Sequence, residues 1–144
     1  MKPTELPKLL ALFAVFGVLL AAPAQSLTAE FPICGSGKRV TCIVDGDTLW
    51  FEGVKYRLEE IDTPEKGGLA QCMQEGLQAI EATKRLAEIM STHEFTIETS
   101  GHDRYGRVLA RFLIGDTTAG EILIAEGLAR PWAGHREDWC ASEF

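Results

Sequence analysis

The feature that most constrains the fold of this chain is a series of three short strand-like runs separated by turn dipeptides. The runs and turns are, in order, residues 39–44, Asp45-Gly46, residues 48–51, Glu52-Gly53 and residues 54–61. Short runs rich in apolar and β-branched residues, bounded by such dipeptides, are typical of consecutive antiparallel strands. The sequence therefore predicts a three-strand meander.

A helix is expected over residues 74–90, because apolar residues recur there at three- and four-residue spacing. The apolar residues are Ala79, Ala82, Leu86, Ile89 and Met90. Lys84, Arg85 and Glu88 fall on the opposite face, which we expect to be solvated.

Two further strands and a second helix are expected after this helix. Phe95 and Ile97 alternate with polar residues and predict a fourth strand, while residues 108–114 predict a fifth. A capping-box pattern starting at Thr118 predicts a short helix that ends near Gly127. Five strands with a helix between the third and fourth is the layout of an OB-fold, a partly open barrel suited to nucleic acids. We therefore expect an α+β fold dominated by β-structure: a five-stranded OB-fold barrel with a short second helix.

The N-terminus has the layout of a secretory signal peptide over residues 1–24. A basic start leads into an apolar stretch over residues 9–22, and small residues occupy the two positions that a signal peptidase reads before Gln25. The stretch is shorter than the ~20 apolar residues of a spanning helix, so a permanent anchor is the less favoured alternative. We expect residues 25–38 to form a lead segment and residues 39–144 the folded domain. The mature chain is expected in the periplasm or outside the cell, without stable membrane association.

Four cysteines follow the expected signal peptide: Cys34, Cys42, Cys72 and Cys140. An even number of cysteines behind an export signal is typical of two disulfides formed in an oxidising compartment. Three pairings are possible, and the sequence does not choose between them. We favour Cys34 with Cys42, because a Gly-Ser-Gly run allows a turn between them, and Cys72 with Cys140. A zinc site is the competing use, but no Cys-x-x-Cys spacing is present and the three histidines are scattered.

Carboxylates and arginines gather in three short motifs, with Arg57 between the first two. The motifs are Val44-Asp45-Gly46-Asp47-Thr48, Ile61-Asp62-Thr63-Pro64-Glu65 and Asp103-Arg104-Tyr105-Gly106-Arg107. Carboxylates hold hard divalent cations through oxygen, and an all-oxygen set favours calcium or magnesium over zinc. Guanidinium groups match the oxygens of a phosphate. Asp-Gly is also an ordinary turn and Asp-Thr-Pro a loop cap, but with both arginines present the set predicts a metal-assisted phosphodiester site.

A fourth segment, in the region of the expected second helix, is the run Gly120-Glu121-Ile122-Leu123-Ile124-Ala125-Glu126-Gly127-Leu128-Ala129. In order and spacing, the three motifs and this run closely resemble the staphylococcal (thermonuclease-like) nuclease family, from about Val40 to Trp132. The resemblance implies the same barrel. It also implies a calcium ion, for which Asp47 and Asp62 match the carboxylate ligands and Thr63 matches a ligand that acts through its backbone carbonyl.

The remaining site residues are also assigned by the resemblance. Arg57 and Arg107 match the pair that grips the scissile phosphate. Glu65 matches the carboxylate assigned to activating water as general base, with an electrostatic or organising role as the alternative. Two further matches, Arg104 and Tyr105, are to residues that contact a terminal nucleotide phosphate. An alanine stands where the family has a tyrosine after the second helix, so the adjacent Trp132 is the candidate base-stacking surface.

The charge of the chain opposes tight binding to a polyanion. Without residues 1–24, which carry Lys2, Lys8 and Glu5, 12 basic and 20 acidic residues remain, a net charge of −8. Affinity for nucleic acids comes largely from counterion release by basic groups, and a negative field opposes approach. We expect weak, salt-sensitive binding through local groups: Arg57, Arg104, Arg107, Arg111 and Arg130.

The resemblance implies a monomeric, calcium-dependent nuclease that cleaves DNA and RNA, single-stranded or unpaired, to 3′-phosphate ends. The alternative is a catalytically silent OB-fold module that binds nucleic acid. Presence of the full set of site residues argues against this alternative. An aspartic protease, suggested by two Asp-Thr pairs, is excluded because neither pair is followed by glycine and the chain is too short for two lobes.

Overall fold

The computed structural model describes residues 24–141. The expected signal peptide lies outside these residues, apart from its last position. The elements in chain order are β1 (Cys42–Asp45), β2 (Thr48–Phe51), β3 (Val54–Leu58), β4 (Ile61–Asp62), η1 (Gly67–Leu69), α1 (Met73–Thr92), β5 (Thr96–His102), β6 (Val108–Ile114), β7 (Thr117–Thr118), α2 (Ala119–Ala125) and β8 (Arg130–Pro131). No helix among the described residues is long and apolar enough to cross a membrane.

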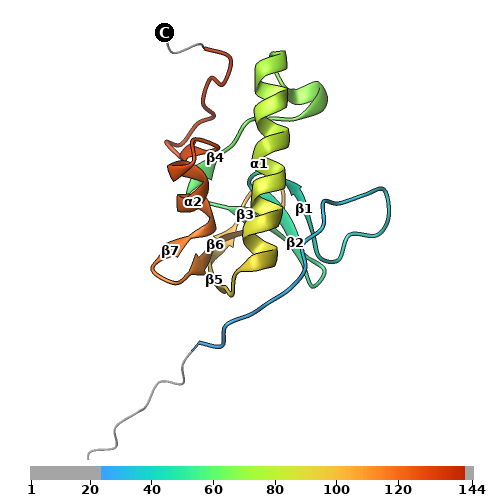
Figure 1. Ribbon diagram of the computed structural model, residues 1–144, viewed down its shortest axis with the longest axis vertical. Coiled ribbons are helices and arrows are strands. Elements are labelled where there is room, and N and C mark those ends of the chain that lie inside the picture. The colour runs from blue at the N-terminus through green and yellow to red at the C-terminus, as the bar shows by residue number, and fades with distance from the viewer. Residues whose placement is uncertain (1–23, 142–144) are drawn as a thin grey trace, which may run out of the picture.

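The main sheet has the strand order β1-β2-β3-β6-β5, with β7 paired to β6. The first three strands are antiparallel neighbours, so the meander is confirmed. β3 and β6 run parallel, and β5 and β6 are antiparallel. Figure 1 shows α1 and α2 packed against this sheet. Within residues 24–141 no pairing joins the edge strands β1 and β5, so the sheet is not a closed barrel. The expected α+β architecture with two helices is present, and closure of the barrel is not confirmed.

The third predicted strand differs from the observed one. We expected a single strand over residues 54–61, but β3 ends at Leu58, and Ile61 and Asp62 form β4, which pairs with β8. The side chain of Arg57 explains the break, because it donates hydrogen bonds to the carbonyls of Leu58 at 2.9 Å and Ile61 at 3.3 Å. By donating to both carbonyls, the Arg57 side chain stabilises the bend at which the chain leaves the main sheet.

The two helices match the expected ones closely. α1 begins one residue before the expected start and ends two residues after the expected end. All five apolar residues predicted for its inner face are buried. In α2, Thr118 is the N-cap of a full capping box, and Gly127 has a positive φ of 74° just after the helix end. Gly46 lets the β1–β2 turn lie against α1, since a Cβ there would stand 2.9 Å from the Cβ of Ala82.

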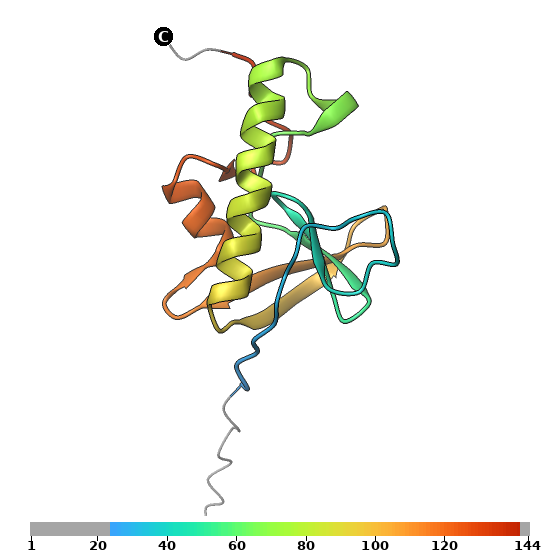
Figure 2. The same cartoon turned by 45° about the vertical axis from the view of Figure 1, so that its right-hand side comes forward.

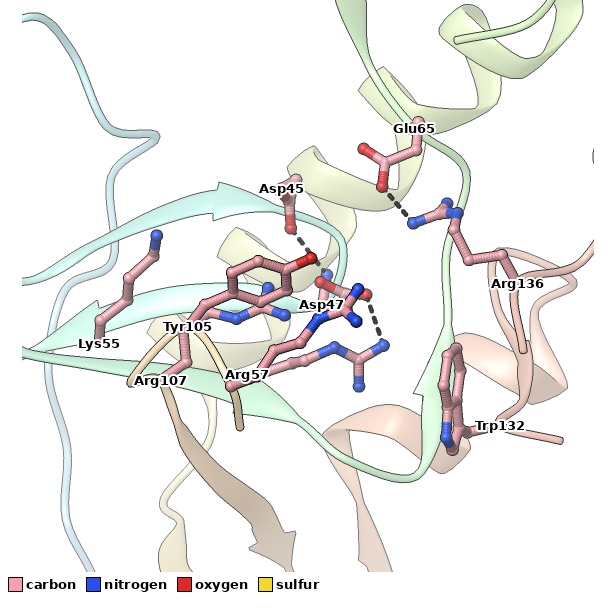
Figure 3. A pocket seen from close by; sticks show the side chains of 10 residues that line it. Asp45, Asp47, Lys55, Arg57, Glu65, Tyr105, Arg107, Trp132 and Arg136 are labelled. Atoms are coloured by element: carbon pink, nitrogen blue, oxygen red, sulfur yellow. Dashed lines mark hydrogen bonds and ion pairs between the residues drawn. The ribbon is translucent and has the colours of Figure 1, made fainter. Parts of the chain in front are cut away.

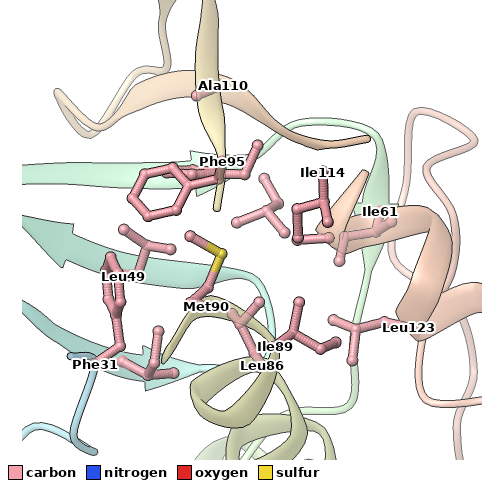
Figure 4. Close-up of a cluster of buried hydrophobic side chains, with 14 of the residues drawn as sticks. Phe31, Leu49, Ile61, Leu86, Ile89, Met90, Phe95, Ala110, Ile114 and Leu123 are labelled. Carbon is pink, nitrogen blue, oxygen red and sulfur yellow. The ribbon is translucent and has the colours of Figure 1, made fainter. Parts of the chain in front are cut away.

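The hydrophobic core lies between the sheet and the two helices (Figure 4). Leu86, Ile89 and Met90 of α1 meet strand residues such as Leu49, and Leu123 of α2 closes one end. The lead segment also contributes, because its Phe31 is only 1% exposed and stacks on Phe51 with ring centroids 5.7 Å apart. Phe31 of the lead segment is therefore part of the core, although most other residues of this segment are exposed.

Both favoured disulfides are present, Cys34–Cys42 and Cys72–Cys140, so all four cysteines are paired. The second joins residues 68 positions apart in the sequence. It ties the segment after β8, residues 132–141, to the start of α1, and Figure 2 shows this segment running behind the upper end of the helix. We call residues 132–141 the C-terminal strap.

Candidate active site

One pocket of about 510 Å³ collects most of the residues singled out in the sequence (Figure 3). It is lined by Asp45, Asp47, Lys55, Arg57, Glu65, Arg104, Tyr105, Arg107, Trp132 and Arg136. An adjoining hollow shares six of these residues, so the two form one groove. The pocket lining has five basic side chains against three acidic ones, although the whole chain is acidic. A local surplus of positive charge thus faces whatever enters the groove.

Asp47 lies in the turn between β1 and β2 and has its two oxygens in different contacts. Oδ1 accepts a hydrogen bond from the Thr48 hydroxyl at 2.8 Å, and Oδ2 lies 3.4 Å from Nη2 of Arg57. The N–H of Asp47 donates to Oδ1 of Asp45 at 3.3 Å, so Asp45 shapes the turn. Burial and the nearby charge of Asp45 raise the pKa of Asp47 to about 7, against the lowering effect of Arg57. The positive charge of Arg57 is therefore not enough to offset the burial of this carboxylate and the charge of Asp45.

Arg57 reaches into the pocket from β3 and is held on several sides. Besides its bonds to the carbonyls of Leu58 and Ile61, its guanidinium pairs with Asp47 and lies over the ring of Trp132, 4.9 Å from the ring centroid. A planar donor oriented in this way loses little further freedom when it binds an anion.

Arg107 approaches from the turn before β6. Its Nε donates to Oδ2 of Asp103 at 2.6 Å, and its Nη1 donates to the Thr48 hydroxyl at 3.3 Å. Burial alone would raise the pKa of Asp103, but hydrogen bonds from Arg107 and from the Tyr105 amide outweigh burial and lower it. The exposed ring of Tyr105 lies under the guanidinium groups of both Arg104 and Arg107, at 4.9 and 5.6 Å. The turn therefore presents two cations and one aromatic face to the groove.

Asp62 is fully buried and is held by the C-terminal strap. Its Oδ2 accepts hydrogen bonds from the Glu137 amide at 3.0 Å and from Nε1 of Trp139 at 2.9 Å. Its Oδ1 has no hydrogen-bond partner among the described residues, and Nη2 of Arg136 lies 3.8 Å away. The same Nη2 donates to the carbonyl of Thr63 at 3.2 Å.

Glu65 lies on the opposite side of the pocket from Arg107 and forms an ion pair with Arg136 (Figure 3). Its amide donates to Oε1 of Glu75 at 3.0 Å, while Oε2 of Glu75 accepts from the Gln71 amide at 2.7 Å. Burial raises the pKa of Glu65; Arg136 opposes this, and the charges of Asp47, Glu75 and Asp62 add to it. Glu65 is thus a carboxylate with raised proton affinity on a loop held by α1.

Comparison with known proteins agrees with the motifs. Residues 55–141 match the model of the family described as staphylococcal nuclease homologue. The chain belongs to this family. The expected relationship is therefore confirmed, and the matched span includes Arg57, Asp62, Glu65, Arg107 and the C-terminal strap.

Three curated relatives are named as endonucleases. An uncharacterized endonuclease of Haemophilus influenzae is 28% identical over 127 residues, which cover 87% of this chain and 62% of that protein. Two Bacillus subtilis proteins, the SPbeta prophage-derived endonuclease YokF and endonuclease YncB, are 36% and 33% identical over 96 residues. Each alignment covers 60% of this chain, with 31% of YokF and 44% of YncB. The chain thus spans less than two thirds of the length of these relatives.

The donor set of this staphylococcal nuclease homologue suits a hard cation. Among residues 24–141, no three His, Cys, Asp or Glu side chains converge as a metal cluster. The expected set is different, since it consists of two carboxylates and the carbonyl of Thr63, and calcium completes its shell with water. The raised pKa of Asp47 and the unpartnered Oδ1 of Asp62 are both conditions that a divalent ion would relieve.

Glu75, Asp103 and Arg136 are site residues to which sequence reasoning gave no role. Asp103 stood inside a motif, four residues before Arg107, where a turn brings the two together. Glu75 stood near the start of the expected helix, with no sign that it would face the Glu65 loop. Arg136 had no signal beyond its charge, because no periodic pattern marks the strap.

Proposed function

We propose that this protein is an exported, calcium-dependent nuclease that hydrolyses phosphodiester bonds of DNA and RNA and leaves 3′-phosphate ends. The observation that carries the proposal is the grouping of Arg57, Arg107 and buried Asp47 in one groove lined mainly by basic side chains. The pKa of Asp47 is raised there, so a further positive charge would stabilise its ionised form. Membership in the family and the names of the three relatives support the same chemistry. The two disulfides suit an oxidising compartment.

Arg57 and Arg107 would grip the scissile phosphate from two sides. In phosphoryl transfer, most of the rate comes from positioning and from donors that strengthen as charge builds on the phosphate oxygens. Asp47 and Asp103 already orient the two guanidinium groups. A bound calcium ion, held by Asp47, Asp62 and the Thr63 carbonyl, would add positive charge to the same oxygens.

Glu65 would accept the proton of the attacking water. The water oxygen bonds to phosphorus, the bond to the 5′ oxygen breaks and that oxygen leaves as a hydroxyl with a proton from solvent, and the phosphate stays on the 3′ oxygen. A carboxylate whose pKa is raised holds that proton better at neutral pH, which suits a general base. The hydrogen bond from the Glu65 amide to Glu75 fixes the loop that presents it.

We infer that the site prefers unpaired strands to a duplex. Tyr105 is 69% exposed and Trp132 is 40% exposed, so both rings are available to stack on bases. Stacking on aromatic side chains requires bases that are not already stacked in a helix. Arg104, beside Tyr105, would contact a neighbouring phosphate.

A nuclease assay on labelled single-stranded DNA and RNA, with calcium, magnesium or chelator, tests the proposal. We expect cleavage in calcium, loss of cleavage in chelator, and products that accept a new 5′ label but need dephosphorylation before 3′ extension. Binding of the strands without cleavage in any ion would favour the silent OB-fold module instead. Cleavage that persists in chelator would contradict the role of the ion.

A further inference from the structure

Arg136 belongs to none of the sequence motifs, yet it contacts three residues of the proposed site. It donates to the Thr63 carbonyl at 3.2 Å, lies 3.8 Å from Oδ1 of Asp62 and pairs with Glu65. The first two atoms are proposed ion ligands. The guanidinium therefore lies beside two of the atoms proposed to hold a divalent ion.

Arg136 places a positive charge beside the buried carboxylate of Asp62. Oδ1 of Asp62 is buried without a hydrogen-bond partner in the described chain, and burying a carboxylate is costly unless a positive charge lies near. Arg136 supplies that charge from 3.8 Å. A divalent ion at the same oxygens would supply it instead and would repel the guanidinium.

The backbone around Arg136 is held by contacts of the strap, whereas its side chain is half-exposed. The backbone is anchored by the Cys72–Cys140 disulfide and by the hydrogen bonds of Glu137 and Trp139 to Asp62. The side chain itself is 44% exposed, so it has a path into solvent. It also lines the groove with Arg57 and Arg107, where a released guanidinium would face phosphate oxygens.

We propose that Arg136 is a tethered cation that competes with the divalent ion for Thr63 and Asp62 and so raises the ion concentration that the site requires. The inference rests on the proposed function, because it assumes that these residues hold an ion. Removing the charge should tighten ion binding by ~10-fold, a figure that allows for the weakening of the repulsion by solvent at a half-exposed group.

Calorimetric titration of calcium into the oxidised full chain, without nucleic acid, tests this. Arg136→Gln removes the charge and keeps a donor, and Arg136→Lys keeps the charge. Arg85→Gln removes the same charge from an ion-pair network that joins α1 to Glu126 at the end of α2, and controls for net charge. We expect Arg136→Gln to bind calcium ~10-fold more tightly than the parent, with the other two variants within ~2-fold of it.

The outcomes separate this inference from the function on which it rests. If the parent binds calcium and Arg136→Gln binds it equally or more weakly, the inference about Arg136 is overturned and the proposed function is not. Tighter binding by Arg85→Gln to the same extent would also overturn it, because net charge would then be the cause. Failure of all four proteins to bind calcium would overturn both the inference and the calcium-dependent function.

Discussion

Asp47 is a buried carboxylate on which opposite influences act. Burial and Asp45 favour its protonated form, and Arg57 favours its charged form. The pKa of about 7 shows that burial and Asp45 prevail. Residues of this kind cluster at functional sites, where a ligand or an ion relieves the conflict. At the residue scale, this conflict supports the proposed cation site and costs the ion-free protein some stability.

This conflict predicts a pH dependence of stability in the ion-free protein. Because the folded pKa of about 7 lies above the ordinary value of 3.8, the folded state binds more protons, and stability falls as pH rises from about 4 to 7. Asp47→Asn removes the titrating group and with it this pH dependence. We expect its free energy of unfolding, relative to the parent, to rise by up to ~4 kcal/mol across that window.

Urea unfolding of both proteins in chelated buffer from pH 4 to pH 7 measures the difference. Asp116→Asn, at an exposed turn, is the control and should follow the parent. A gap between Asp47→Asn and the parent that does not grow with pH would contradict the raised pKa.

At the scale of elements, the sequence predicted those strands and helices whose ends are marked locally. β2 and β6 match their expected residues because turn residues bound them, and α2 starts at Thr118 because a capping box does. The split between β3 and β4 was missed, because no turn dipeptide marks it and it is accompanied instead by hydrogen bonds from the Arg57 side chain to two nearby carbonyls. The strap was missed for a similar reason, since the Cys72–Cys140 disulfide and buried Asp62 set its position rather than any periodicity.

The site residues also divide into those that the sequence predicted and those that only the fold reveals. Residues within motifs were predicted by position, and the structure brings Asp47, Arg57, Glu65 and Arg107 to one pocket. Glu75 acts on Glu65 from 10 positions away in the sequence and Arg136 from 71, so only the fold reveals them.

Because Cys72–Cys140 anchors the strap and Cys34–Cys42 does not, we expect removal of the two disulfides to affect activity differently. Replacing Cys72 and Cys140 together by alanine should cost ~2–5 kcal/mol of stability and also lower turnover by tenfold or more, because Arg136 and Trp139 lose their anchor on the site. Replacing Cys34 and Cys42 together is the matched control, with a stability cost but little loss of turnover. Urea unfolding and initial cleavage rates at a temperature where both variants are folded would compare them. Equal loss of turnover in both would contradict a role for the strap.

At the scale of the whole molecule, an acidic protein presents a basic groove. The chain carries a net charge of −7, yet five basic side chains line the pocket against three acidic ones. The global field slows the approach of a polyanion, and the local one orients it once bound. This arrangement suits brief encounters and turnover rather than tight binding.

Binding of single-stranded DNA should therefore be weak and salt-dependent. For ~2–4 phosphate contacts, the slope of log K against log salt should be roughly −1.4 to −2.8. Fluorescence anisotropy with the Glu65→Gln variant, across a range of salt concentrations, measures it. A slope near zero would mean that stacking on Tyr105 and Trp132 carries the affinity.

The cleavage rate of single-stranded DNA in calcium, compared between the parent and the folded variants Arg107→Ala and Glu65→Gln, tests the central claim most directly. Arg107→Ala removes a donor that strengthens as charge builds on the phosphate, so turnover should fall by ~10²–10³. Glu65→Gln keeps the shape but removes the proton acceptor, and should cost ~10²–10⁴. Arg85→Ala, in an exposed ion pair between α1 and the end of α2, should cleave like the parent. Cleavage at the parent's rate by both Arg107→Ala and Glu65→Gln would contradict the assignment of this groove as a nuclease site.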